Sequence, residues 1–104
     1  MAIVYATDEN FRELTAEGPV VVDFFSKTCV PCKMLAKVLE EVDDEFPFVN
    51  IVKVDIDDCP KAAEEFAVSG IPDIYYYKDG KVAAHDIGFG MKSEVMDRIA
   101  SIMY

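Results

Sequence analysis

The sequence predicts an α/β fold, in which a central mixed β-sheet of about five strands is flanked by four helices on both faces, within a single domain over residues 1–104. Three observations lead to this prediction. β-prone and helix-periodic segments alternate along the chain, as in a sheet covered by helices. The run Val20–Phe25 is apolar on both faces, which is typical of a central strand. Asp79-Gly80 is the residue pair expected in a tight hairpin turn.

The N-terminal segment predicts a short strand followed by a helix. Ile3–Ala6 is a short apolar stretch that fits an edge strand. Thr7 or Asp8 is expected to cap the helix, because short polar side chains accept hydrogen bonds from the first unpaired N–H groups. Phe11 and Leu14 are three residues apart, so the apolar face of this helix points toward a core.

Apolar periodicity and helix-breaking residues define the remaining elements. Pro47 ends the longest helical segment, and Pro60 suits the first turn of the next helix. The predicted elements are a strand at 20–25, a helix at 34–46, a strand at 49–57, a shorter helix at 60–66, strands at 73–78 and 81–87, and a helix from about 93.

Cys29-Val30-Pro31-Cys32 lies where the strand at 20–25 leads into the long helix. Two cysteines at this spacing can close a small disulfide or present two thiols. The first N–H groups of a helix are unpaired and its dipole favours negative charge there. We therefore expect the pKa of Cys29 to lie below that of a free thiol. Pro31 suits the first helical turn, where its missing N–H costs nothing. The motif predicts a site that holds a reactive sulfur.

Composition excludes several classes of function. The chain has a net charge of −10, which repels nucleic-acid phosphates and anionic lipid, so we expect neither as a partner. No apolar run approaches the length of a membrane span. The first residues, Met1–Ala6, lack a basic region and are followed by acids, which argues against a signal peptide. Three cysteines do not suit a secreted disulfide scaffold, and a reducing cytoplasm fits better.

Asp23 is the one anomaly in the apolar strand at 20–25. One interpretation is a half-exposed carboxylate on an edge strand. The other is a buried acid, which is expensive among apolar neighbours unless its proton is used. We favour the second interpretation and expect desolvation to raise the pKa of Asp23.

These features together resemble the thioredoxin family over essentially the whole chain. The motifs that carry the resemblance are the Cys29–Cys32 pair after a strand bearing Asp23, Gly70-Ile71-Pro72 ahead of a β-prone run, and Lys78-Asp79-Gly80-Lys81. A C-x-x-C alone is weak evidence, but its position in a βαβ pattern favours a thioredoxin-like redox site. The resemblance implies the thioredoxin fold and a thiol–disulfide oxidoreductase that reduces protein disulfides.

The resemblance also implies a role for individual residues. Cys29 would be the nucleophile that attacks a substrate disulfide, and Cys32 would resolve the mixed disulfide. Asp23 matches the buried carboxylate that handles the proton of the second cysteine, and Lys53 matches the lysine beside it. Pro72 matches the cis-proline that lies against the disulfide and aligns the substrate backbone.

The family also suggests a substrate surface and partners. The residues expected to form an apolar docking rim are Val30, Pro31, Ile71, Pro72, Gly88 and Phe89. The implied partners are protein disulfides and a thioredoxin reductase or similar electron donor. No cofactor or metal is implied, and we expect a cytoplasmic monomer that works in electron transport and cell redox homeostasis.

The sequence departs from the usual family pattern around the dithiol. Thr28 and Phe25 occupy two positions where tryptophan is usual, so the chain has no tryptophan. Val30 replaces the common glycine between the cysteines, and Lys37 stands where a helix-kinking proline is often found. These departures place the chain among atypical thioredoxins and bear on its substrate range and potential.

Asp73 follows Pro72, where threonine is common, and its charge opposes a thiolate. Lys27 and Lys33 add positive charge, which would favour a thiolate at Cys29. We expect Asp73 to dominate because it is closer to the sulfur than mobile lysines. Cys29 would then titrate higher than in an ordinary thioredoxin. Thr28 and Asp73 are thus predicted to modulate the site.

Two alternatives to a redox site remain at this stage. A zinc site would need Cys59 and His85 as further ligands, and their spacing is unlike a structural zinc pattern. We expect Cys59 to be solvent-facing or half-buried and His85 to be solvated. The second alternative is a thioredoxin-like module that docks a partner through the rim without redox turnover.

Overall fold

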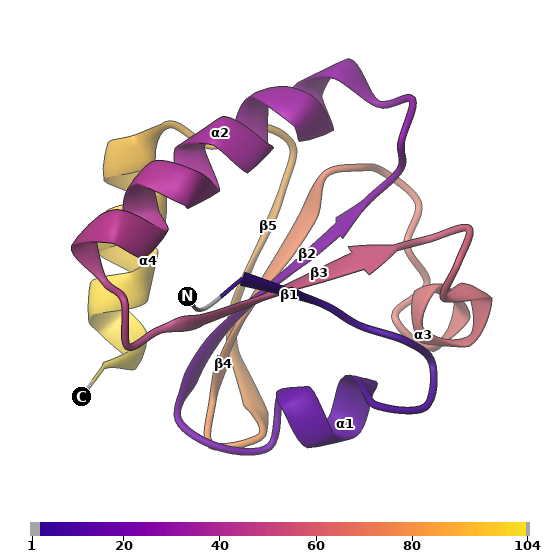
Figure 1. Ribbon diagram of the computed structural model, residues 1–104, viewed down its shortest axis with the longest axis horizontal. Helices are drawn as coiled ribbons and strands as arrows, with labels where there is room; N and C mark the ends of the chain where they lie inside the picture. Colours follow the sequence, from indigo (N-terminus) through magenta and orange to yellow (C-terminus); the bar gives the residue numbers. More distant parts are fainter. Residues whose placement is uncertain (1–2, 104) are drawn as a thin grey trace.

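The computed structural model describes residues 3–103 and contains a five-stranded mixed sheet with helices on both faces (Figure 1). The strand order is β1-β3-β2-β4-β5, so β2 lies at the centre of the sheet. The elements are β1 (Ile3–Tyr5), α1 (Phe11–Leu14), β2 (Pro19–Phe25), α2 (Val30–Glu45), β3 (Asn50–Asp55), α3 (Pro60–Glu65), β4 (Asp73–Lys78), β5 (Lys81–Ile87) and α4 (Lys92–Ile102). The predicted fold class is confirmed.

Strand direction divides the sheet into two parts. β1, β3 and β2 are parallel, whereas β4 is antiparallel to β2 and β5 is antiparallel to β4. α2 and α4 cover one face, and α1 and α3 cover the other (Figure 1). The dithiol segment therefore leaves the carboxyl end of the central strand, where α/β sheets commonly place their functional sites.

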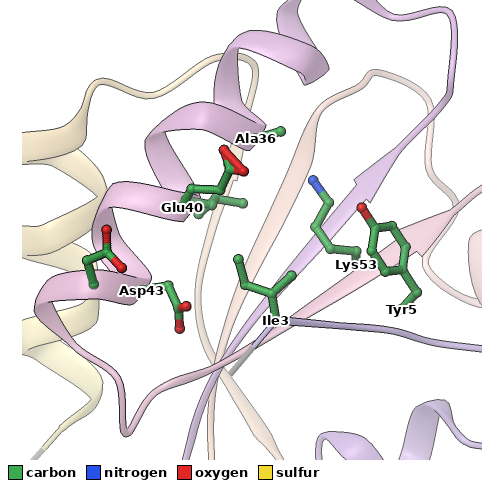
Figure 2. Close-up of a pocket in the computed structure, with 8 residues that line it drawn as sticks. Ile3, Tyr5, Ala36, Glu40, Asp43 and Lys53 are labelled. Atoms are coloured by element: carbon green, nitrogen blue, oxygen red, sulfur yellow. The ribbon is translucent and has the colours of Figure 1, made fainter. Parts of the chain in front are cut away.

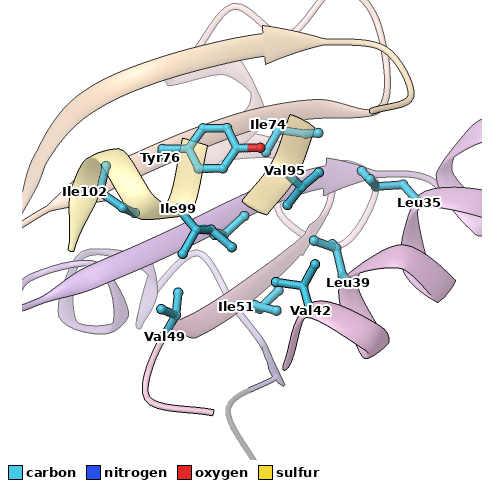
Figure 3. Packing of buried hydrophobic residues seen from close by; sticks show 11 residues of the cluster. Leu35, Leu39, Val42, Val49, Ile51, Ile74, Tyr76, Val95, Ile99 and Ile102 are labelled. Carbon is cyan, nitrogen blue, oxygen red and sulfur yellow. The ribbon is translucent and has the colours of Figure 1, made fainter. Parts of the chain in front are cut away.

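The core has two halves, one on each face of β2. Val21 belongs to the half under α2 and α4, and Val20, Val22 and Phe24 belong to the half under α1 and α3. All four side chains are fully buried, which confirms a strand buried on both sides. Figure 3 shows how side chains of α2 and α4 meet over the sheet in the first half: Leu35, Leu39, Val42, Val95, Ile99 and Ile102.

Local boundaries differ from the sequence-based expectations in three places. α2 starts at Val30 rather than Met34, so the dithiol lies in its first turn. The strand predicted at 49–57 ends at Asp55, where the chain turns into α3. The helix before β2 is only one turn long, and the expectation that Asp8 caps it was wrong.

Asp8 caps a different helix. Its carboxylate accepts hydrogen bonds from the backbone N–H groups of Ala62 (2.9 Å) and Lys61 (3.3 Å) in the first turn of α3. Thr7 instead exchanges side-chain and backbone hydrogen bonds with Asn10 ahead of α1. A capping residue identified by type alone therefore does not reveal which helix it serves, because a tertiary contact satisfies the same N–H groups.

The β4–β5 hairpin closes through Asp79 and Gly80 as predicted. Both residues have positive φ angles, 49° and 83°, which suits the two-residue turns that match strand twist. Asp79 also ties the hairpin to the loop before β2, because its Oδ1 accepts a hydrogen bond from the N–H of Gly18 at 2.9 Å. Within residues 3–103, none of the helices combines the length and the apolar character needed to cross a membrane.

Replacing Gly80 with alanine is expected to lower the free energy of unfolding by about 1–3 kcal/mol, because a left-handed backbone is strained for an L side chain and the new Cβ would meet a neighbour. That Cβ would lie 3.2 Å from the Ala16 carbonyl oxygen. Gly18→Ala is a matched control, since Gly18 also has a positive φ (71°) but no atom lies within 4 Å of its added Cβ. Urea unfolding checks the prediction, and equal losses in the two variants would show that the close contact does not matter.

Candidate active site

Cys29 and Cys32 are joined in a disulfide at the start of α2, with Cα atoms 5.2 Å apart. Cys29 is the N-cap of the helix, and its Sγ accepts a hydrogen bond from the backbone N–H of Cys32 at 3.2 Å. Pro31 occupies the first turn. Cys29 is half-buried, whereas Cys32 is only 2% exposed. An incoming disulfide can therefore reach Cys29 and not Cys32.

Asp23 and Lys53 form a buried ion pair beneath α2. They are register partners on β2 and β3, and Lys53 Nζ lies 2.7 Å from Asp23 Oδ2. Asp23 has no exposed surface, so the interpretation as a half-exposed edge carboxylate was wrong. Burial raises the pKa of Asp23 above the ordinary carboxyl value, and Lys53 acts in the opposite direction without cancelling that effect.

Asp23 faces the same side of the sheet as the dithiol helix. Val21, two residues earlier on β2, packs against α2, and side chains two apart on a strand share a face. Lys53 Nζ lies 4.7 Å from the centroid of the Phe25 ring, so the aromatic residue at the end of β2 also contacts the ammonium. The carboxyl group is thus held on the face of the sheet that α2 covers, with a cation beside it.

A cavity of about 490 Å³ lies between the β1 edge of the sheet and α2 (Figure 2). Lys53 lines it, together with Tyr5 from β1 and Glu40 and Asp43 from α2. Cys29 and Cys32 are not among the lining residues. The cavity therefore gives the Lys53 end of the buried pair access to water between β1 and α2.

The segments expected to form the docking rim come together beside the end of β2. The Ile71–Pro72 peptide bond is cis, as the resemblance implied for Pro72. The N–H of Gly88 donates a hydrogen bond to the Pro72 carbonyl oxygen at 2.8 Å, which joins two of the rim segments. The register pairs Asp73 with Phe24, so Pro72 lies next to the strand end from which the dithiol loop departs.

Exposure distinguishes the members of the rim. Val30 and Phe89 are large apolar side chains with 64% and 41% of their surface exposed. Ile71 and Gly88 are half-buried, and Pro72 is buried. Thr28, just before Cys29, and Pro31, between the two cysteines, are both exposed. The surface around Cys29 therefore offers apolar contacts.

Asp73 is buried, with 3% of its surface exposed, and its Oδ1 lies within hydrogen-bond distance of His85 Nε2. The His85 ring stacks on Tyr75, with ring centroids 4.0 Å apart and an interplanar angle of 9°. His85 keeps 37% of its side chain exposed, but the expectation that it is merely solvated was wrong. Asp73 is thus a partnered acid rather than the free carboxylate assumed in weighing the charges around Cys29.

Lys27 is also partnered. Its Nζ lies 2.6 Å from Asp55 Oδ2 and 3.1 Å from Asp58 Oδ2. These hydrogen bonds raise the pKa of Lys27. Burial alone would raise the pKa of Asp55, but the hydrogen bonds from Lys27 and from the N–H groups of Asp57 and Asp58 outweigh it and hold that pKa below the ordinary value. Two carboxylates offset the positive charge expected from Lys27, whereas Lys33 remains exposed without an ion-pair partner in the described part of the chain.

Cys59 is fully buried, so the expectation of a solvent-facing or half-buried residue was wrong. Its thiol donates a hydrogen bond to the Ala6 carbonyl oxygen at 3.2 Å. Burial raises the pKa of Cys59, and nearby acids, Asp8 foremost, add to this effect. Across residues 3–103, no three His, Cys, Asp or Glu side chains are grouped to hold a metal ion.

Comparisons with known proteins agree with this site. A family model described as Thioredoxin matches residues 2–101. Thioredoxin from Chlamydia trachomatis is 44% identical over 94 residues, which cover 90% of this chain and 92% of that protein. Thioredoxin from Bacillus subtilis is 42% identical over 100 residues, covering 95% and 96% of the two chains. A solved chain from work on the thiol-resolving mechanism in yeast mitochondrial 1-Cys peroxiredoxin via glutathione/thioredoxin systems superposes with a TM-score of 0.87 at 29% identity, covering 96% of this chain and 95% of that one.

Proposed function

This chain belongs to the thioredoxin family and is a thiol–disulfide oxidoreductase, and from this premise we propose that it reduces protein disulfides with Cys29 as nucleophile and Cys32 as resolving thiol. The observation that carries the assignment of roles is the difference in exposure between the two sulfur-bearing residues. A nucleophile must reach its substrate, whereas a resolving thiol needs only to reach its neighbour.

The reaction proceeds in two exchanges. The Cys29 thiolate attacks one sulfur of the substrate disulfide, forms a mixed disulfide and releases the other substrate sulfur as a thiolate, which takes up a proton. Cys32 then loses its proton and attacks Cys29 Sγ. This step forms the Cys29–Cys32 disulfide and releases the second substrate thiol. Two electrons pass from the protein to the substrate, and a two-electron donor must return them.

Positioning contributes more to the rate than thiolate activation. Lowering a thiol pKa from about 8.5 to about 7, a value typical of thioredoxin, raises the thiolate fraction at pH 7 from roughly 3% to roughly half. The lower nucleophilicity of the more acidic thiol removes about fivefold of that gain. Holding Cys32 one helical turn from Cys29 makes the second exchange intramolecular, where effective molarities reach about 10⁵ M.

The Asp23 carboxylate accepts the proton of Cys32 and becomes a neutral carboxylic acid, and Lys53 assists by favouring the ionised form of Asp23 that can accept this proton. Burial of Asp23 on the face of the sheet that α2 covers supports this role, because its raised pKa brings the carboxyl group closer to the pH at which it exchanges protons with a thiol. The water-accessible cavity beside Lys53 provides a path by which the buried pair exchanges its proton with solvent.

The substrate binds along the rim as an extended segment. Val30 and Phe89 supply apolar contacts, and the backbone next to Pro72 supplies hydrogen-bonding groups. Thr28, Ile71 and Gly88 border the same surface. Small or absent side chains at Thr28 and Gly88 leave room for a bulky substrate residue near the sulfurs.

The physiological setting follows from the same reasoning. The protein acts as a monomeric single domain in the cytoplasm, where it carries electrons from a thioredoxin reductase or similar donor to protein disulfides. The acidic balance of the chain, with a net charge of −10, supports partners that are proteins rather than nucleic acids or anionic membranes.

Reduction of insulin by dithiothreitol tests the proposed roles. The wild-type protein is expected to accelerate precipitation of the insulin B chain, and Cys29→Ser to return the rate to that of dithiothreitol alone, because the thiols of Cys32 and Cys59 are buried. Cys59→Ser is the matched control, since it removes a buried thiol and should leave the rate unchanged. Equal acceleration by the wild type and Cys29→Ser would contradict the assignment of Cys29.

A further inference from the structure

Lys27 ties the loop that carries the dithiol to a neighbouring element. Residues 26–28 connect β2 to α2, and a backbone hydrogen bond from Cys29 N–H to the Ser26 carbonyl oxygen (3.3 Å) closes the turn locally. In the part of the chain that the structure describes, the only hydrogen bonds or ion pairs that tie these residues to another element run from Lys27 to Asp55 and Asp58.

Asp55 is built to be a fixed acceptor. Its side chain is 6% exposed, and its Oδ1 accepts hydrogen bonds from the N–H groups of Asp57 (2.8 Å) and Asp58 (3.4 Å). Its carbonyl oxygen accepts a further hydrogen bond from Cys59 N–H at 2.8 Å. Only Oδ2 remains for a partner outside this turn, and Lys27 Nζ occupies it at 2.6 Å. The anchor is therefore rigid even though the lysine itself is exposed.

We propose that Lys27 is a positioning residue for Cys29: its ammonium clamps the dithiol loop to the turn that follows β3, through Asp55 and secondarily through Asp58. This contact is called the Lys27 clamp below. It deepens the proposed function, because it acts on the nucleophile of that same site. Lys27 touches neither substrate nor sulfur and works only through the position of the loop.

The clamp matters because the environment of Cys29 depends on loop geometry. Cys29 is the N-cap of α2, with φ −84° and ψ 111°, and in this conformation its Sγ accepts a hydrogen bond from the N–H of Cys32. A thiolate accepting this N–H is stabilised by a charge-assisted hydrogen bond. Lys27 lies two residues upstream, so release of its side chain frees the segment that sets the Cys29 backbone.

Stability is the wrong measure for this contact. Ion pairs with an exposed partner contribute little to folding, and Lys27 has 68% of its side chain exposed. The informative measurement is the pKa of the Cys29 thiol in the reduced protein, obtained from the pH dependence of iodoacetamide alkylation with the modified cysteine identified by mass. A merely structural contact would leave this titration unmoved.

Lys27→Met is expected to lower the thiolate fraction of Cys29 at pH 7 about three- to tenfold, corresponding to loss of part of a charge-assisted hydrogen bond. Lys27→Arg retains a cation that reaches Asp55 and should titrate as the wild type does. Lys33→Met is the control for loss of a lysine beside the dithiol, and its effect should be much smaller. Asp58→Asn, which removes only the exposed secondary partner, should also have a small effect.

Asp55→Asn separates positioning from simple charge. Removing a negative charge and freeing the Lys27 ammonium would by themselves favour the thiolate and lower the pKa of Cys29. Loss of the clamp acts in the opposite direction, so the proposal predicts a raised pKa and a lower thiolate fraction. The asparagine side chain can still accept from the N–H groups of Asp57 and Asp58, which preserves the turn.

An Asp55→Asn protein whose Cys29 titrates at or below the wild-type pKa overturns the proposal, and so does a shift in Lys27→Arg as large as that in Lys27→Met. Circular dichroism verifies that each variant is folded, and Lys27→Met, at an exposed position, keeps the test valid if Asp55→Asn unfolds. Insulin reduction by the wild type tests the proposed function separately. If the wild type is active while all variants titrate alike, only the clamp is wrong.

Discussion

Asp23→Ala is expected to unfold at a higher urea concentration than the wild type at pH 8, with a gain on the order of 1–3 kcal/mol. At this pH the carboxyl group is ionised in the unfolded chain, so folding must either bury that charge or take up a proton, because Asp23 has no exposed surface. Removing one member of a buried ion pair usually destabilises a protein, because the other charge is left unpaired. Here Lys53 lines a cavity of about 490 Å³ open to water, so its ammonium can be hydrated when Asp23 is absent.

The gain should depend on pH in a defined direction. Because the pKa of Asp23 is raised in the folded state, the folded protein binds a proton at Asp23 more tightly than the unfolded chain does. The contribution of Asp23 protonation to the stability of the fold is therefore fully present below the pKa of this carboxyl group in the unfolded chain. It is lost as the pH rises through the pKa of Asp23 in the folded protein. Asp23→Ala should differ least from the wild type in acid and most at alkaline pH, as urea titrations at several pH values would reveal.

The same substitution is expected to slow the second exchange by about 10²-fold near pH 7, which is the lower range for loss of a general base. The rate should recover at high pH, where Cys32 ionises without help. Decay of a preformed mixed disulfide, followed by stopped flow, measures this step alone. Lys53→Met is the paired control: it leaves the buried carboxylate unpaired and should destabilise the protein at pH 8. An Asp23→Ala protein less stable than the wild type at pH 8 would contradict the argument.

Cys32→Ser is expected to retain attack on substrates and to lose turnover, so that the protein accumulates as a mixed disulfide through Cys29. An external thiol at millimolar concentration cannot replace an intramolecular one, for which effective molarities reach about 10⁵ M. Incubation with a protein disulfide and non-reducing electrophoresis should show a covalent adduct approaching one equivalent. Cys29→Ser should give none.

The control variant Cys29→Ala, Cys32→Ala distinguishes turnover from simple docking. It keeps the rim of Val30, Ile71 and Phe89 but lacks both sulfurs. If this variant captures the same partners as Cys32→Ser under denaturing, non-reducing conditions, the adduct does not arise from the dithiol. Capture only by Cys32→Ser places the bond at Cys29.

The order of the elements and the dithiol could be predicted because each depends on local sequence. A two-sided apolar strand, a proline in a first helical turn and an Asp-Gly hairpin each have a direct physical cause within a few residues. The burial of Asp23 could be inferred for the same reason, since its neighbours on β2 are all apolar.

The contact between His85 and Asp73 could not be predicted by counting from the turn. Lys78 pairs with Lys81, so a regular hairpin would place His85 opposite Ile74, on the other face from Asp73. A register shift between Tyr76 and Tyr77 moves the pairing by one residue, so that Tyr75 lies opposite His85. A single bulge moves the side chains that follow it to the opposite face of the sheet, and the local sequence does not predict this bulge.

The contacts of Asp8, Lys27 and Cys59 were missed for a related reason. Asp8 caps a helix more than 50 residues away, and Lys27 reaches a turn 28 residues away. Cys59 is buried because the segment after β1 covers it, as its hydrogen bond to Ala6 shows. Pairings at such separations are decided by the packing of whole elements, and the residue types alone permit many other partners.

The buried thiol of Cys59 can serve as a probe of local unfolding in this protein. Its sulfur has no route to a reagent in the native state, and its pKa is raised, so alkylation there requires a fluctuation that separates the segment after β1 from the start of α3. When reclosing is faster than alkylation, the labelling rate at Cys59 measures the equilibrium population of that open state. Mass spectrometry of the alkylated, reduced protein thus follows two processes in one experiment. Alkylation of the dithiol reports its reactivity, and alkylation of Cys59 reports local unfolding on the opposite face of the sheet.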